Sequence, residues 1–73
     1  MSNNTAAKIP VIVSAFNEAG DLLGEFTLFV APGTKFDEVG RQAAFMASHD
    51  HDDAHSISFV DDRLNMHTAE VAR

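Results

Sequence analysis

Residues 9–30 form two largely apolar stretches that a polar turn separates. Residues 9–16 are rich in β-branched side chains, and residues 17–21, Asn-Glu-Ala-Gly-Asp, have the composition of a tight turn. Residues 22–30 form the second stretch, which alternates with a period of two from Glu25 onward. The pattern therefore predicts an antiparallel hairpin. Pro10 has no backbone N–H, which indicates that the first strand begins at a sheet edge or that its pairing starts after residue 10.

A helical period replaces the alternation after the breaker Ala31-Pro32-Gly33. Thr34 stands where a helix N-cap is expected, and Asp37 follows three residues later in a partial capping box. The helix is predicted to end near Ser48. Apolar residues recur along it at the spacing of one buried stripe, which comprises Phe36, Val39, Gly40, Ala43, Met46 and Ala47. Phe45 lies roughly opposite this stripe, where it either anchors a partner or is sheltered by a chain terminus.

The rest of the sequence returns to strand patterns. Residues 56–60 alternate again and predict a third strand, and Asp61-Asp62 predicts a turn after it. Residues 63–68 favour a fourth, weaker strand, although residues 65–73 also suit a frayed helix.

The order of these elements predicts a small two-layer α+β domain. A flexible N-terminal arm is expected at residues 1–8 and a single domain at residues 9–73, since 73 residues are too few for a second domain. In this β-β-α-β(-β) order, the helix packs on one face of a mixed or antiparallel sheet. The element order and the Pro-Gly-Thr entry to the helix resemble the β-grasp shape of ubiquitin-like domains.

One helix can cover only one face of the sheet, so the two faces are expected to differ. The inward set that the alternation predicts comprises Val11, Val13, Ala15, Phe26, Leu28, Val30, Ile57 and Phe59. The other face keeps the apolar residues Ile12, Phe16, Phe29 and Val60 among Ser14, Glu25, Thr27, Ser56 and Ser58. Such a cluster with a polar rim is typical of an interaction surface, unless the C-terminal segment covers it with Leu64, Met66 and Val71. The candidate partner-binding residues are therefore Ile12, Phe16, Glu25, Phe29, Phe45 and Val60.

Charge narrows the kinds of partner. Eleven acidic residues against five basic ones give a formal net charge of −6, which repels nucleic-acid phosphates and anionic membranes. No apolar run approaches the roughly 20 residues that span a bilayer, and residues 1–8 lack the apolar run of a signal peptide. We therefore expect a cytoplasmic protein that binds neither nucleic acid directly nor a membrane. The sequence has no Cys, so disulfides and Cys-ligated zinc are excluded.

The most conspicuous chemical feature is a run of histidines and aspartates at residues 49–55. Imidazole and carboxylate groups bind zinc, nickel or copper, so His49, His51 and His55 are candidate metal ligands. The same residues suit a solvated loop between a helix and a strand, in which case any zinc or nickel affinity is incidental and no cofactor is required. The run resembles the H-x-H-x-D-H signature of metallo-β-lactamase-type hydrolases. However, His55 comes one position too late, and the chain is too short for that fold.

Catalytic patterns are missing from the sequence. It contains no G-x-S-x-G, no Gly-rich phosphate loop and no paired carboxylates in an apolar setting. We therefore expect that the chain is not an enzyme.

In its small size, its acidity and its lack of Cys and of catalytic motifs, the chain resembles the host-takeover proteins of lytic bacteriophages. Within that group it looks like the transcription regulators that bind RNA polymerase of a plant-pathogenic bacterium. The resemblance covers the whole chain and rests on its overall character. It implies binding to a large polymerase subunit, inhibition of host transcription initiation and antitermination on phage genes. Three other functions stay open: an accessory subunit of a multicomponent enzyme, a nucleic-acid mimic, and a metal-responsive module that uses residues 49–55.

Overall fold

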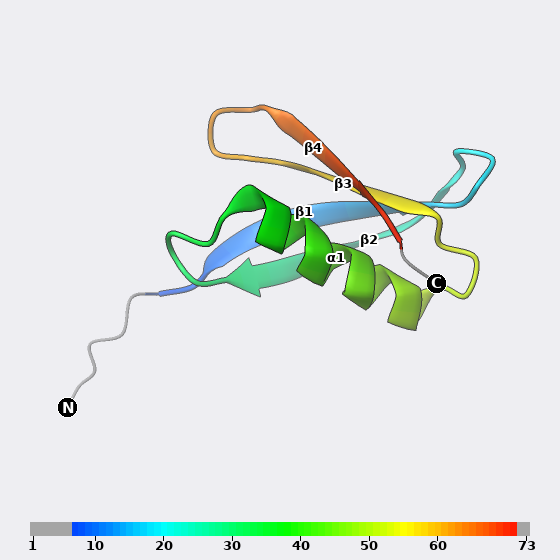
Figure 1. Ribbon diagram of the computed structural model, residues 1–73, viewed down its shortest axis with the longest axis horizontal. Coiled ribbons are helices and arrows are strands. Elements are labelled where there is room, and N and C mark those ends of the chain that lie inside the picture. The colour runs from blue at the N-terminus through cyan, green and yellow to red at the C-terminus, as the bar shows by residue number, and fades with distance from the viewer. Residues whose placement is uncertain (1–6, 72–73) are drawn as a thin grey trace.

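The computed structural model, which describes residues 7–71, has one helix packed on one face of a four-stranded sheet (Figure 1). In chain order, the elements are β1 (Ile9–Phe16), β2 (Leu22–Val30), α1 (Phe36–Asp50), β3 (Ser56–Val60) and β4 (Met66–Glu70). This order confirms the predicted α+β class. Most of the predicted N-terminal arm, residues 1–6, lies outside the described residues, as do residues 72–73.

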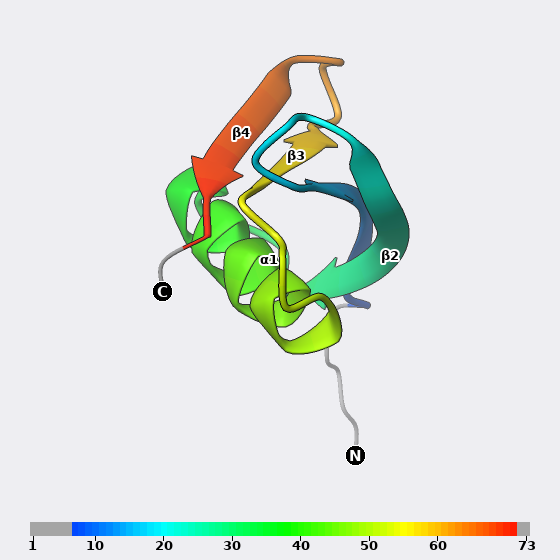
Figure 2. The same ribbon diagram turned by 90° about the vertical axis from the view of Figure 1, so that its right-hand side faces the viewer.

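The strands lie in the order β2-β1-β3-β4, and every neighbouring pair is antiparallel. Because β2 and β3 flank β1 and both run antiparallel to it, they run in the same direction, and their connection must cross the sheet. Helix α1 is that connection, and Figure 2 shows it lying along one side of the sheet. No helix covers the other side within residues 7–71. The two faces of the sheet therefore differ, as the sequence predicted.

Strand β1 is central, but only its second half has a partner strand on both sides. Strand β2 pairs with all of β1, whereas β3 pairs with residues 13–16 alone. Pro10 lies in the first half of β1, opposite Phe29 of β2. Its missing N–H is tolerated because this half is locally a sheet edge, as one of the two predictions stated. The other prediction, that pairing starts after residue 10, is wrong.

The predicted N-cap of the helix, Thr34, is also wrong. Lys35 occupies the N-cap position and makes no side-chain capping bond, so the predicted capping box does not form. The hydroxyl of Thr34 instead donates to the carbonyl oxygen of Ala31 at 2.6 Å and closes the turn that leads into α1. Helix α1 continues to Asp50, two residues beyond the predicted end at Ser48.

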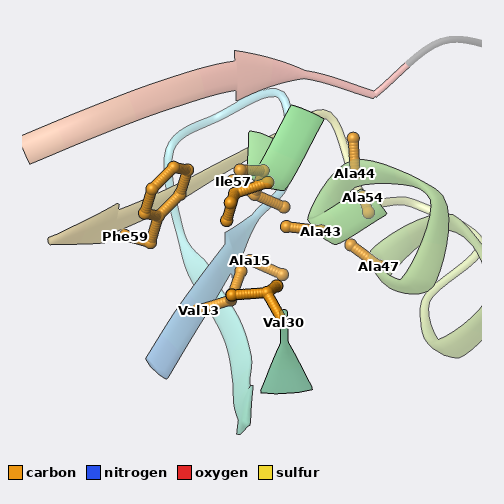
Figure 3. Packing of buried hydrophobic residues seen from close by; sticks show 10 residues of the cluster. Val13, Ala15, Val30, Ala43, Ala44, Ala47, Ala54, Ile57 and Phe59 are labelled. Carbon is orange, nitrogen blue, oxygen red and sulfur yellow. The ribbon is translucent and has the colours of Figure 1, made fainter. Parts of the chain in front are cut away.

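Small side chains let α1 lie close to the sheet. The buried core comprises Val13, Ala15, Val30, Val39, Ala43, Ala44, Ala47, Ala54, Ile57 and Phe59 (Figure 3). A methyl group built on Gly40 would lie 3.4 Å from the Cβ atom of Ala69 in β4. The predicted inward set is confirmed, with Val11, Phe26 and Leu28 partly buried against the core. The predicted helix stripe is wrong at Phe36 and Met46, which stay exposed, because the buried face is rotated towards Ala44.

The fourth strand is confirmed, but it spans residues 66–70 rather than 63–68. All five of its residues pair with β3. A turn at residues 61–65 takes up the positions that the sequence pattern had given to the start of the strand. The alternative prediction, a frayed helix over residues 65–73, is wrong for the described part of this segment.

Candidate functional site

The face of the sheet that α1 leaves open, here called the helix-free face, receives alternate side chains from all four strands. Cross-strand register places Val60 of β3 opposite Met66 of β4. The last β1–β3 pair is Val13 with Phe59, so the next residues of the two strands, Ile12 and Val60, lie beside each other. Phe29 of β2 lies opposite Pro10 and therefore diagonal to Ile12. Opposite and diagonal neighbours in an antiparallel pair lie within about 8 Å of each other, so these side chains adjoin.

We call Ile12, Phe29, Val60 and Met66 the apolar patch. These residues are 57%, 59%, 46% and 70% exposed, respectively. About half or more of each one thus stays in contact with water, although all four are large and apolar. Thr27, which pairs with Ile12, is uncharged, so the register places no charged side chain between the members of the patch. A contiguous exposed apolar cluster of this kind is typical of a surface that binds another macromolecule.

The C-terminal segment does not cover this face within the described residues. The sequence left open that Leu64, Met66 and Val71 fold over the sheet, and this alternative is wrong. Met66 extends the sheet as part of β4 and adds to the exposed cluster, because residues 66–70 pair edge to edge with β3. Val71 packs against the core, and Leu64 is exposed in the β3–β4 turn.

Two other candidate residues lie at the opposite end of the same face. Phe16 is half-buried and pairs with Leu22, which is 57% exposed. The carboxylate of Glu25 accepts a hydrogen bond from the hydroxyl of Ser14 at 3.3 Å. A polar strip that includes Ser14 and Glu25 therefore separates Phe16 from the apolar patch. The structure brings Ile12, Phe29 and Val60 together and leaves Phe16 and Glu25 apart from them.

Phe45 belongs to a different surface. It lies on α1, which packs on the other face of the sheet, and it is 63% exposed. Its ring meets the ring of His49 edge to face, with the ring centroids 4.9 Å apart. The predicted shelter by a chain terminus is not found within residues 7–71. Phe45 therefore cannot share one flat contact area with the apolar patch.

The three histidines of the proposed metal site occupy different environments. His49 lies in the last turn of α1 against Phe45, and His55 is exposed ahead of β3. His51 is half-buried, and a Cβ atom built on Gly24 would lie 3.3 Å from its Nε2 atom, which is closer than an ordinary contact. Within residues 7–71, no three His, Asp or Glu side chains are grouped so that they could hold a metal ion. The metal site stays a prediction from the sequence.

The turn that Asp61-Asp62 predicted is confirmed, but sequence reasoning missed the hydrogen bonds that hold it at the end of the β3–β4 hairpin. The Asp61 carboxylate accepts backbone N–H bonds from Arg63 at 2.8 Å and from Asn65 at 2.9 Å. Its other oxygen lies 2.9 Å from the Nε2 atom of His67. These bonds, led by the one to His67, lower the pKa of Asp61 from its ordinary value of 3.8 to about 2. The carboxylate therefore stays ionised and holds the turn in place at all but strongly acidic pH.

Two aromatic rings fix the position of His67. The ring of Phe59 is stacked on it with a centroid distance of 5.0 Å, and the ring of Phe36 lies 4.5 Å away at a tilt of 36°. Phe59 belongs to the buried core, whereas Phe36 opens α1. The β3–β4 turn is thus tied through Asp61 and His67 to both layers of the domain.

Comparison of the chain with known protein families, with characterised proteins and with solved structures gave no match. Within residues 7–71, no helix has the length and apolar character needed to cross a membrane.

Proposed function

We propose that this chain is a regulator that works by binding a protein, and that it docks through the apolar patch on its helix-free face. The observation that carries the proposal is the grouping of four large apolar side chains, each roughly half or more exposed, where the fold provides no cover within the described residues. An apolar centre with a polar rim is the usual composition of a protein interface. The polar strip with Ser14 and Glu25 supplies one side of that rim.

The partner that we propose is a large subunit of bacterial RNA polymerase, in the cytoplasm of a host bacterium. Inhibition of host transcription initiation, with antitermination on phage genes, would be the outcome of binding. The resemblance in size and acidity to phage transcription regulators supports this choice of partner. The distribution of charge is compatible with it.

Carboxylates gather at the end of the domain where the β1–β2 turn and the α1–β3 loop lie side by side. The backbone N–H of His55 in that loop donates to the carbonyl oxygen of Phe16, and the same end is visible at the right of Figure 1. Six acidic residues belong to these two connections and the adjoining ends of α1 and β4: Glu18, Asp21, Asp50, Asp52, Asp53 and Glu70. Within residues 7–71, no Lys or Arg belongs to these two connections. Such an end is attracted to basic surfaces, which polymerases present to nucleic acid, while the uncharged patch makes the apolar contact.

Binding and transcription assays with purified bacterial RNA polymerase test the proposal. The wild-type chain should be retained by the polymerase and should inhibit initiation at a host promoter. Val60→Asp puts a charge into the patch and should abolish both effects. Thr68→Asp adds the same charge to an exposed position in the polar part of the same face and should leave both effects in place. Equal behaviour of the two variants would contradict the proposed docking surface, and no binding by the wild-type chain would contradict the proposed partner.

An accessory subunit of a multicomponent enzyme would also dock through an apolar face. Capture from a bacterial lysate distinguishes the two functions, because the accessory subunit would retain enzyme components and the regulator would retain polymerase subunits.

A further inference from the structure

Leu64, in the β3–β4 turn, has a backbone conformation that leucine rarely adopts. Its φ angle is 65°, and it is the one non-glycine residue with a positive φ within residues 7–71. It is also 85% exposed, more than the other large apolar residues of the described chain. The position therefore combines an unfavourable backbone conformation with the loss of nearly all the burial that makes a leucine stabilising.

The geometry of the turn explains why the conformation is required. The N–H of Asp61 donates to the carbonyl oxygen of Asn65 at 3.0 Å, and the N–H of Leu64 donates to the carbonyl oxygen of Asp61 at 3.0 Å. These bonds enclose a three-residue hairpin loop of residues 62–64. The third residue of such a loop takes the left-handed conformation, so glycine is the usual choice there. A leucine at this place works against folding.

The turn holds Leu64 in a fixed position. The Asp61 carboxylate binds the N–H groups on both sides of Leu64, those of Arg63 and Asn65, and is itself held by His67. A side chain presented on a pre-ordered backbone requires little further ordering of the backbone when it binds. Leu64 also lies close to the apolar patch, because Met66 follows it by two residues and pairs with Val60.

We propose that Leu64 is an anchor residue that enters a leucine-sized apolar pocket in the partner protein and extends the apolar patch beyond the sheet. The inference rests on the proposed protein-binding function. Unfavourable backbone conformations persist where a functional site requires them, and a partner pocket supplies the burial that the described chain does not. Asp62 and Arg63, both exposed beside Leu64, provide a polar rim around the anchor. A protein is a better fit than a membrane, since one leucine on a chain of net charge −6 offers little attraction for a bilayer.

Leu64→Gly distinguishes a role in binding from a role in folding. It removes the anchor side chain, and it also removes the unfavourable backbone conformation, because glycine adopts a positive φ readily. We expect it to raise the thermal unfolding midpoint by about 4 °C. Leu64→Ala removes the side chain but keeps an L-residue at positive φ, so its midpoint should stay below that of Leu64→Gly. A lower midpoint for Leu64→Gly than for the wild-type chain would overturn the proposal, because Leu64 would then be stabilising the fold.

Binding is measured with purified bacterial RNA polymerase, and both variants should lose affinity by tenfold or more. Leu22→Gly is the control, since Leu22 is also exposed but lies at the other end of the helix-free face; it should bind like the wild-type chain. Wild-type affinity in Leu64→Gly and Leu64→Ala would overturn the anchor role while leaving the proposed function intact.

If the polymerase does not bind the wild-type chain, the proposed function is wrong. Two other probes then test the anchor role of Leu64. One is a bacterial lysate, from which the wild-type chain and Leu22→Gly should retain the same protein and the Leu64 variants should not. Equal retention by all four chains, or retention of nothing, would overturn the anchor role. The other is a set of vesicles of phosphatidylcholine and phosphatidylglycerol. If the wild-type chain sediments with these vesicles and Leu64→Gly does not, Leu64 binds a membrane and the proposal of a protein partner is wrong.

Discussion

Replacing Ile12 by threonine tests the apolar patch quantitatively. Threonine keeps a β-branched side chain, so the change is mild for a strand but removes apolar surface. Full burial of an isoleucine contributes about 1.5–3 kcal/mol, and 57% of Ile12 is exposed before any partner binds. Burial of that remaining surface by a partner would contribute on the order of 1–1.5 kcal/mol. We therefore expect Ile12→Thr to weaken binding to the partner by roughly five- to tenfold.

Leu22 provides the matched control for this experiment. It is also 57% exposed and lies on the same face, but in the row that holds Phe16 rather than in the patch. Leu22→Thr should therefore cost a similar amount of folding stability and leave binding unchanged. Isothermal titration calorimetry with purified polymerase gives the binding constants, and urea unfolding gives the stabilities. Equal affinities of Ile12→Thr and the wild-type chain, or an equal loss in Leu22→Thr, would refute the reasoning.

Three further predictions concern the fold. Since the pKa of Asp61 is lowered from 3.8 to about 2, the folded state gains stability from this carboxylate above pH 4 and loses it as the pH falls from about 4 to 2. Asp61→Asn should flatten that loss in thermal melts recorded from pH 2 to 5, and an unchanged slope would contradict the assigned bonds. Gly40→Ala should stabilise the domain by roughly 0.5–1 kcal/mol in urea unfolding, because glycine is unfavourable inside a helix. The new methyl group would make an ordinary contact at 3.4 Å with Ala69. A destabilised variant would show that α1 has no room for a methyl group at this position. Phe59→Ala should cost about 3–5 kcal/mol and release the ring of His67, seen as a changed His67 side-chain NMR signal; a loss below about 1 kcal/mol would contradict the central place of Phe59 in the core.

The alternation of apolar residues was sufficient to predict β2, β3 and the inward face of the sheet, whereas β4 was predicted to begin three residues too early. A period of two assigns each residue of a strand to one face without knowledge of its neighbours. Ile57 and Phe59 were therefore placed correctly from their own strand alone. The helix end and the helix cap were harder to predict from the sequence. The cap was misassigned because the Thr34 hydroxyl forms a competing bond to Ala31 that the capping pattern does not reveal.

The candidate site could be predicted only in part, since alternation does not give cross-strand register. Ile12, Phe29 and Val60 were assigned to the right face, but Phe16 shares that face without being near them. Met66 was missed as a member of the patch, because its position depends on where β4 begins after the turn. The role of Asp61 was equally hidden, as its bond to His67 joins residues that only the folded hairpin brings together.

Phe45 shows a further limit of the sequence pattern. Its exposure followed from the helical period, but the period does not indicate which side of the domain the helix covers. The structure places Phe45 and the apolar patch on different layers. A set of exposed apolar residues is therefore a set of candidates, and the topology of the sheet decides which of them form one surface.

Methyl cross-saturation NMR with a deuterated, methyl-labelled chain tests the docking surface most directly. On addition of purified bacterial RNA polymerase, saturation should reach the methyl groups of Ile12, Val60 and Met66 first and leave those of Leu22 unaffected. Saturation that misses the patch, or that is centred on methyl groups of α1 such as Met46, would contradict the proposal that the chain binds its partner through the helix-free face.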